Sequence, residues 1–225
     1  AAGRLGVGRA WVFSILLAAA GLGVAAAVNR DTLVVLGGYL LLQALYTRFL
    51  KHKMLLDVIG IAMGFVLRAV AGAVAIGVEI SPWLFVCTFT LCLFMGFCKR
   101  CNEIVTIGEP DQAAAHRPTL TGYTVNLLTH LITVSAGVAV VGFLLYATSP
   151  RTVGNFHTSM LVYTLPLVFY GVFRFAMLSM FGSYSDPTEL ILRDRPFQMT
   201  LVLWLGAAAA ILKWADRLPS WLAGL

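Results

Sequence analysis

The chain has 225 residues, of which 60% are hydrophobic and only 12% are charged, and its mean hydropathy is +0.87. A soluble domain carries about 25% charged residues, so this composition excludes an ordinary water-soluble globular protein and indicates the lipid bilayer as its surroundings. The net charge of +6 does not by itself indicate a nucleic-acid partner, because the positions of the cations decide what they serve. We expect no nucleic acid among the partners.

Seven apolar stretches follow one another along the chain, and each approaches the roughly 20 residues that a transmembrane helix needs. They cover residues 10–28, 32–47, 54–78, 82–99, 120–147, 157–182 and 197–213. Polar residues and prolines separate them, as at Asn29-Arg30-Asp31 and at Arg195-Pro196, where Pro196 suits the first turn of a helix. The sequence therefore predicts an all-α, polytopic transmembrane helical bundle in which residues 1–225 form a single transmembrane domain.

The cations are divided unequally between the two sides of this bundle. Ten lie on one side, namely Arg4, Arg9, Arg48, Lys51, Lys53, Lys99, Arg100, Arg117, Arg193 and Arg195. Four lie on the other side, namely Arg30, Arg151, Lys213 and Arg217. Cytoplasmic connections carry an excess of Lys and Arg, so we expect the ten-cation side to face the cytoplasm, in the inner (plasma) membrane. The long connections lie on this side too, and we expect the chemistry there.

Two further arginines, Arg68 and Arg174, lie inside predicted spans. A cation near the bilayer centre costs about 2.5–3.5 kcal/mol on insertion scales, so each is a candidate functional residue. Asp57 precedes Arg68 by eleven residues, close to three helical turns, which places both on one helix face. Two interpretations stay open: a structural contact between Asp57 and Arg68, or a site for an anionic ligand entered from the cytoplasmic end.

Cations, carboxylates and tyrosines from four predicted helices gather at the cytoplasmic side. They include Tyr46, Lys51, Lys99, Arg100, Glu103, Arg117 and Tyr123. A positive-inside bias explains the cations but not the interleaved carboxylates and tyrosines. Cations bind phosphate oxygens, and carboxylates bind Mg²⁺ that shares those oxygens. This pattern indicates chemistry on a phosphorylated or pyrophosphorylated substrate that has a lipid as its other half.

The segments that carry these residues resemble the UbiA superfamily of intramembrane prenyltransferases and, within it, the branch that transfers phosphoribosyl groups to decaprenyl phosphate. The segments are residues 46–52, 57–72, 81–83, 99–103, 116–118, 186–189 and 194–196. Aromatic prenyltransferases of the superfamily have an Asp-x-x-x-Asp motif where this chain has Lys99, Arg100 and Glu103. That difference favours the phosphoribosyl branch.

The resemblance implies nine transmembrane helices around a cavity open to the lipid, with Mg²⁺ as cofactor. It implies phosphoribosyl pyrophosphate as donor and a polyprenyl (decaprenyl) phosphate lipid as acceptor. Seven spans are present of the expected nine. We expect two helices and the first Asp-rich motif, which would hold the main Mg²⁺ site, to precede Ala1, and we expect the chain as given to be inactive alone.

The resemblance also implies roles for individual residues. Catalytic roles fall on Glu103, Asp57 and Tyr46, and Glu103 and Asp57 are also candidate Mg²⁺ ligands. Substrate-binding roles fall on Lys51, Arg68, Lys99, Arg100, Arg117, Tyr123 and Arg174. The sequence therefore predicts one phosphate-handling site at the cytoplasmic ends of several helices.

Alternatives to this function stay open at the level of sequence. One is transfer of a polyprenyl group from a polyprenyl diphosphate to an aromatic acceptor. Another is a degenerate, non-catalytic subunit of a larger membrane complex. A homo-oligomer is also compatible with the sequence, which does not specify the oligomeric state.

Overall fold

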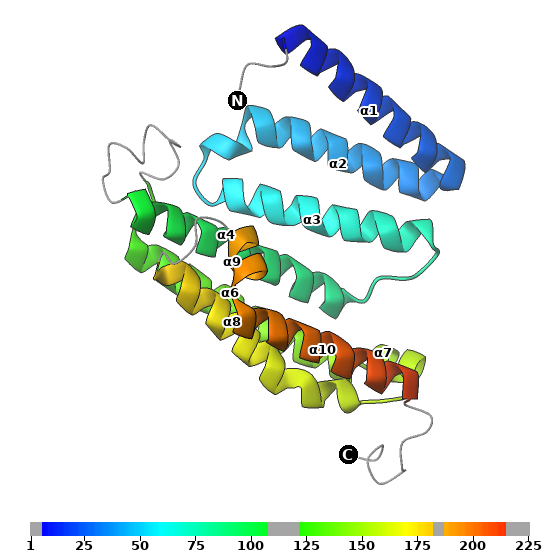
Figure 1. The fold of residues 1–225 in the computed structure, drawn as a ribbon. Helices are drawn as coiled ribbons and strands as arrows, with labels where there is room; N and C mark the ends of the chain where they lie inside the picture. The colour runs from blue at the N-terminus through cyan, green and yellow to red at the C-terminus, as the bar shows by residue number, and fades with distance from the viewer. Residues whose placement is uncertain (1–5, 108–121, 182–186, 215–225) are drawn as a thin grey trace.

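The computed structural model describes residues 6–107, 122–181 and 187–214, which fold as a bundle of α-helices (Figure 1). The long helices are α1 (Val7–Val28), α2 (Arg30–Arg48), α3 (Leu56–Ala75), α4 (Pro82–Ile107), α6 (Val125–Thr148), α8 (Leu165–Met180) and α10 (Arg195–Trp214). Short segments between them are η1 (Leu50–His52), α7 (Pro150–Phe156), η3 (Met160–Thr164) and α9 (Pro187–Arg193). Within the described chain, seven helical segments are long and apolar enough to cross a membrane, which confirms the predicted helical membrane bundle.

The largest difference from the predicted spans is the length of α4. The sequence predicted its end at residue 99, but the helix continues to Ile107. Arg100 and Glu103, which made residues 100–107 look like a loop, lie on this helix and form an ion pair with each other. Because carboxylates compensate the buried charge of Arg100, these residues lie on a continuous helix rather than on a loop.

The predicted turn at Asn29-Arg30-Asp31 is a capped helix junction. The Asn29 side-chain oxygen accepts a hydrogen bond from the Thr32 backbone N–H at 2.6 Å, which satisfies a free donor in the first turn of α2. The Asn29 amide donates to the Val74 carbonyl oxygen at 3.1 Å, near the end of α3. One side chain therefore caps α2 and ties the α1–α2 corner to the third helix.

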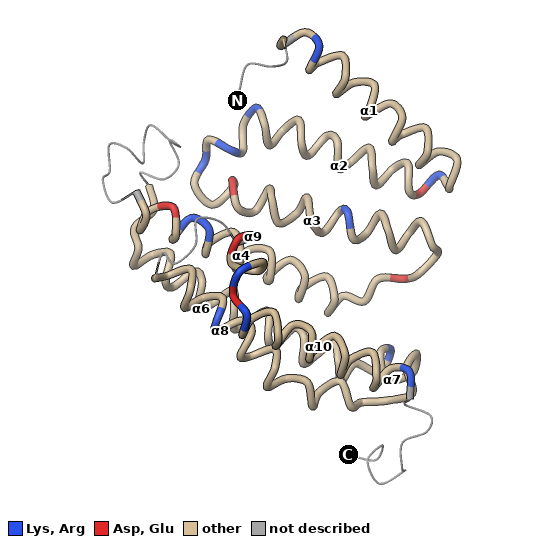
Figure 2. The backbone as a smooth tube through the Cα atoms, viewed as in Figure 1, with Lys and Arg blue, Asp and Glu red and all other residues tan. Residues whose placement is uncertain are grey.

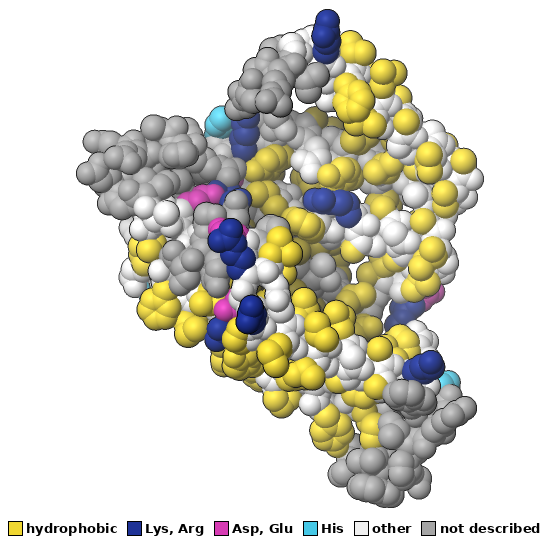
Figure 3. Space-filling model, viewed as in Figure 1, with side chains coloured by type: hydrophobic (Ala, Val, Ile, Leu, Met, Phe, Trp, Pro, Cys, Tyr) yellow, Lys and Arg dark blue, Asp and Glu magenta, His cyan; other side chains and the backbone are white. Residues whose placement is uncertain are grey.

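The helices α1 to α4 lie side by side in sequence order, with α1 at one edge of the row (Figure 1). The helix α4 then packs against α6 and α8, and α10 packs against α8. The buried core lies where α4, α6 and α8 meet and includes Phe94, Cys98, Leu128 and Phe175. Apolar side chains cover much of the outer surface (Figure 3). Most charged residues lie near the ends of helices, and one basic position lies midway along α3 (Figure 2).

Glycines allow the closest helix contacts. A methyl group on Gly96 of α4 would lie 2.5 Å from Val58 Cγ1 of α3. On α6, a methyl group on Gly142 would lie 3.2 Å from the Cα atom of Cys87 on α4 and 3.3 Å from its backbone nitrogen. Small residues let helix backbones approach closely in membranes, where van der Waals packing holds helices together. The α4–α6 contact therefore depends on the missing side chain of Gly142.

We expect Gly142→Ala to lower the stability of the bundle, because the added methyl group meets the α4 backbone, which cannot rotate away. Overpacking of this kind typically costs about 1–3 kcal/mol. The matched control is Gly137→Ala on the same helix, where the added methyl group meets nothing within 4 Å. Thermal unfolding in detergent should show a lower midpoint for Gly142→Ala than for Gly137→Ala. Equal midpoints would contradict the close α4–α6 contact.

Candidate functional site

A buried ion pair joins α3 to α4 at the end of the bundle that carries η1. The Asp57 side chain is fully buried and the Arg100 side chain is 3% exposed, and Arg100 Nε lies 3.2 Å from Asp57 Oδ2. Sharing a face with Arg68 does not bring Asp57 into contact with it, because eleven residues separate the two by about 16 Å along the helix axis. Of the two interpretations, the structural contact between Asp57 and Arg68 is therefore wrong. The partner of Asp57 is Arg100.

Tyr123, which lies just before α6, completes this buried cluster. Its hydroxyl group donates to Asp57 Oδ1 at 3.0 Å and accepts a hydrogen bond from the Leu55 backbone N–H at 2.8 Å. Leu55 has a left-handed φ of 67°, and this hydrogen bond helps to hold that uncommon conformation at the start of α3. Burial raises the pKa of Tyr123 to about 12, and Asp57 contributes in the same direction. The hydroxyl group therefore stays protonated and can donate to Asp57 at neutral pH.

Glu103 lies on the other side of Arg100 and forms an ion pair with it, three residues further along α4. Its side chain is 23% exposed, so part of the carboxylate faces outward. Lys99 is partly exposed and lies one helical turn before Glu103 on the same helix. We call Asp57, Arg100, Glu103 and Tyr123 the buried charge cluster. It brings together four residues that the sequence predicted for the site.

Two other predicted site residues approach the same end from α2 and η1. The ring of Tyr46 packs over Gly60 of α3, where a methyl group would lie 2.9 Å from Tyr46 Cδ2. Lys51 lies in η1 and is partly exposed. Arg117 lies outside the described residues. The structure thus places Tyr46 and Lys51 at the end of the bundle where the buried charge cluster lies.

The part of the chain that the structure describes, residues 6–107, 122–181 and 187–214, holds no cluster of three or more His, Cys, Asp or Glu side chains that could bind a metal ion. Asp57 is fully buried against Arg100 and Tyr123, and Glu103 is also paired with Arg100. This geometry favours a positioning role for Asp57 over the predicted role as a metal ligand.

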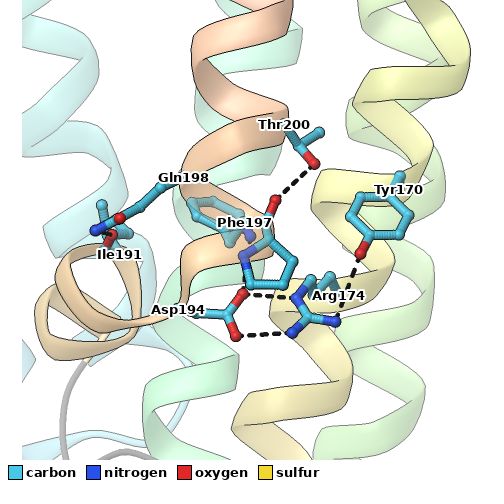
Figure 4. Close-up of polar contacts among 8 residues, drawn as sticks. Tyr170, Arg174, Ile191, Asp194, Phe197, Gln198 and Thr200 are labelled. Carbon is cyan, nitrogen blue, oxygen red and sulfur yellow. Dashed lines mark hydrogen bonds and ion pairs between the residues drawn. The ribbon is translucent and has the colours of Figure 1, made fainter.

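Arg174, the second arginine inside a span, has a carboxylate partner (Figure 4). Its Nε atom lies 2.6 Å from Asp194 Oδ2 and its Nη2 atom lies 2.8 Å from Asp194 Oδ1. Asp194 also caps α10 by accepting a hydrogen bond from the Phe197 backbone N–H at 2.8 Å. The hydrogen bonds from Arg174 hold the pKa of Asp194 below its usual range. The pair joins α8 to the α9–α10 junction, which favours a structural role for Arg174 over the predicted substrate contact.

Sequence reasoning missed this partner of Arg174. Asp194 stands between Arg193 and Arg195, and local spacing alone suggests that these neighbours neutralise it. Arg193 instead pairs with Glu189 at 3.1 Å, one turn earlier on α9. The sequence did contain a signal for the capping role of Asp194. An aspartate directly before Arg195-Pro196 is typical of a helix N-cap.

An apolar cavity of about 270 Å³ lies between α4, α6, α8 and α10. Almost all of its lining is apolar, and it includes Leu91, Phe94, Phe143, Val172, Phe197 and Trp204. Ile191 of α9 also contributes to the wall, close to the Arg174–Asp194 pair. Such a lining suits a hydrocarbon chain rather than a polar ligand.

We expect Tyr123→Phe to destabilise the protein by about 1–3 kcal/mol, because it leaves Asp57 Oδ1 and the Leu55 N–H without this partner in a buried site. The matched control is Tyr163→Phe, since Tyr163 is 55% exposed. Denaturant or thermal unfolding in detergent would measure both variants. A Tyr123→Phe protein as stable as Tyr163→Phe would show that the hydroxyl group does not hold the buried charge cluster together.

Comparisons with known proteins agree with this helical architecture. The chain matches the UbiA prenyltransferase family over residues 1–186. It is similar to decaprenyl-phosphate phosphoribosyltransferases. The protein of Mycolicibacterium smegmatis is 30% identical over 216 residues, covering 93% of this chain and 67% of that protein. The protein of Corynebacterium glutamicum is 30% identical over 212 residues (91% and 62%), and that of Mycobacterium tuberculosis is 27% identical over 203 residues (89% and 65%).

The chain spans about two thirds of the length of these relatives. The family match covers most of the chain, from the first helix to the end of α8. Together with the seven apolar helices in the described chain, it makes the protein an integral, multi-pass membrane protein. The chain belongs to the UbiA prenyltransferase family.

Proposed function

We propose that the protein transfers a 5-phosphoribosyl group from phosphoribosyl pyrophosphate to a polyprenyl phosphate, such as decaprenyl phosphate, within the membrane. The observation that carries this proposal is the buried charge cluster, in which Arg100 is held between Asp57 and Glu103. The cluster fixes the end of α4 that presents Lys99 and Glu103 on one helical turn. The names of the three relatives support the choice of donor and acceptor.

In this reaction an oxygen of the lipid phosphate attacks the anomeric carbon of the donor ribose. The bond from that carbon to the pyrophosphate oxygen breaks, and negative charge grows on the leaving pyrophosphate. Lys99 and Lys51, both partly exposed at this end of the bundle, would neutralise that charge. Arg100 is 2% exposed, so its role is to position Glu103 rather than to touch the substrate.

Glu103 is the carboxylate of the cluster with an exposed part, which suits hydrogen bonds to the ribose hydroxyl groups of the donor. Tyr46 would orient the donor beside Lys51. We propose Mg²⁺ as the cofactor, and the pairing of Asp57 and Glu103 with Arg100 leaves these carboxylates little room to serve as its main ligands. Mg²⁺ supplies neutralisation of pyrophosphate charge in reactions of this class.

The apolar cavity between α4, α6, α8 and α10 supports a lipid acceptor, because it offers a hydrocarbon chain a lining with almost no polar surface. We place the reacting end at the cytoplasmic face of the inner membrane. The end that carries η1 holds Arg48, Lys51 and Lys53 on a short connection, and such cation-rich connections face the cytoplasm.

We expect Lys99→Ala to lower phosphoribosyl transfer by about 100-fold, since loss of one group that stabilises transition-state charge typically has an effect of this size. Glu103→Ala should also lower transfer, because it removes the carboxylate that we assign to the ribose hydroxyl groups. The control is Arg151→Ala, at the opposite end of the bundle, where Arg151 pairs with exposed Glu79. Transfer of radiolabelled phosphoribosyl groups to decaprenyl phosphate in membranes would be measured for the complete protein and each variant, alongside the amount of folded protein.

Three results would contradict this proposal. One is an equal loss of transfer in Arg151→Ala, and another is a loss that follows the amount of folded protein in every variant. The third is that the wild-type protein forms a prenylated aromatic product from a polyprenyl diphosphate but no phosphoribosyl lipid.

A further inference from the structure

Three polar side chains converge over Gly64 in the middle of the bundle. A methyl group on Gly64 would lie 3.6 Å from Gln43 Nε2, 3.8 Å from Tyr39 Cε2 and 3.9 Å from Arg68 Nη2. Tyr39 and Gln43 come from α2, and Arg68 comes from α3. Gly64, which has no side chain, therefore lets the three polar side chains come together at this point, away from the buried charge cluster.

The polar groups at this position are mainly donors. Gln43 Nε2 donates to the Tyr39 hydroxyl group at 2.9 Å, so the tyrosine proton is directed elsewhere and can be donated to a ligand. Arg68 Nε donates to the Gly64 carbonyl oxygen at 3.2 Å. Within residues 6–107, 122–181 and 187–214, the terminal nitrogens of Arg68 have no hydrogen-bond acceptor or carboxylate partner. A group of donors with no carboxylate suits an anion.

Arg68 lies deep in the membrane part of α3. It follows Leu56, the first residue of α3, by twelve residues, a rise of about 18 Å, so it lies near the middle of a hydrocarbon layer about 30 Å thick. Figure 2 shows a basic position midway along α3, far from the charged ends of the bundle. An isolated cation at such a depth is costly, so a partner for Arg68 is favoured.

The contrast with Arg174 shows what is missing at Arg68. Arg174 is neutralised by two hydrogen bonds from its guanidinium group to Asp194. Besides its bond to the Gly64 carbonyl oxygen, Arg68 has the rings of Phe65 and Tyr39, at 4.3 Å and 5.4 Å from its Cζ atom to the ring centroids. These rings offset part of the cost of placing a cation at membrane depth, but within the described residues they leave the terminal N–H groups without an acceptor.

We propose that Arg68, Tyr39 and Gln43 form an intramembrane site for a phosphate monoester. The ligand is the phosphate group of the polyprenyl phosphate acceptor, which binds here before the lipid reaches the reacting end of the bundle. This inference rests on the proposed function for the identity of the lipid. A lipid phosphate fits better than a soluble pyrophosphate, because the site is about 16 Å from Asp57 along α3. Arg68 is exposed there beside the exposed apolar side chain of Phe65. Burial of the hydrocarbon chain among apolar groups contributes favourable free energy, which helps to offset the cost of placing the lipid phosphate at this depth.

Binding can be measured without turnover, in the complete protein reconstituted in nanodiscs with no donor present. Native mass spectrometry would count bound polyprenyl phosphate at increasing mole fractions, with the uncharged polyprenol as a lipid control. We expect Arg68→Gln to weaken binding of polyprenyl phosphate by about 10-fold to 100-fold, since a hydrogen bond to a charged group contributes about 1.5–3 kcal/mol. Polyprenol binding should not change.

Further variants separate a ligand contact from a folding defect. Arg68→Lys keeps the charge and should recover much of the binding, and Tyr39→Phe should weaken it by a few fold. The matched control is Arg30→Gln, which removes an exposed cation at the first residue of α2, nine residues before Tyr39 on the same helix. This control should bind polyprenyl phosphate like the wild-type protein.

The possible results distinguish this site from the proposed function. If wild-type protein binds polyprenyl phosphate through Arg68 but transfers no phosphoribosyl group, the site stands and the proposed reaction fails. If transfer occurs but Arg68→Gln binds polyprenyl phosphate as tightly as wild type, the site is wrong and the reaction stands. If Arg68→Gln instead weakens binding of phosphoribosyl pyrophosphate alone, the anion comes from the soluble donor and the proposal is overturned.

Discussion

The buried ion pair between Asp57 and Arg100 is the interaction on which the rest of the candidate site depends. Removing one partner from such a pair typically costs about 3–5 kcal/mol, because the other charge stays buried without compensation. Here the pair also fixes other residues, since Tyr123 donates to Asp57 and Glu103 pairs with Arg100. One ion pair thereby holds the starts of α3 and α6 against the end of α4 and orients the carboxylate that we assign to the donor.

The two arginines inside spans show how differently a membrane protein can accommodate the same residue. Arg174 is held by Asp194, so its charge serves the junction of α8, α9 and α10. Arg68 is held by a backbone carbonyl group and two aromatic rings, which leaves donors available for a ligand. Judged by depth in the bilayer alone, both arginines would be candidate functional residues. The presence or absence of a carboxylate partner in the described chain separates a structural arginine from a candidate ligand contact.

The sequence predicted the seven membrane helices because each is a long apolar stretch bounded by polar residues or proline, as at Asn29 and Pro196. It also predicted that Asp57, Arg100, Glu103 and Tyr123 belong to one end of the bundle. It could not predict which charges pair, because Asp57 meets Arg100 and Arg174 meets Asp194 only through tertiary packing. Helical periodicity reports the face on which a residue lies but not the neighbouring helix, which is why the sequence left the partner of Asp57 open. The extension of α4 to Ile107 was missed for the same reason, since burial of Arg100 depends on its partners.

A double-mutant cycle on Asp57 and Arg100 tests the central claim most directly. The free energies of unfolding of Asp57→Asn, Arg100→Gln and the double variant would be measured in the same detergent. If the pair holds the site end together, each single variant should be strongly destabilised. The double variant should then be more stable than the sum of the two effects predicts, with a coupling energy of about 2 kcal/mol. Additive effects, or single variants as stable as the wild-type protein, would show that the pair does not hold α3 and α4 together.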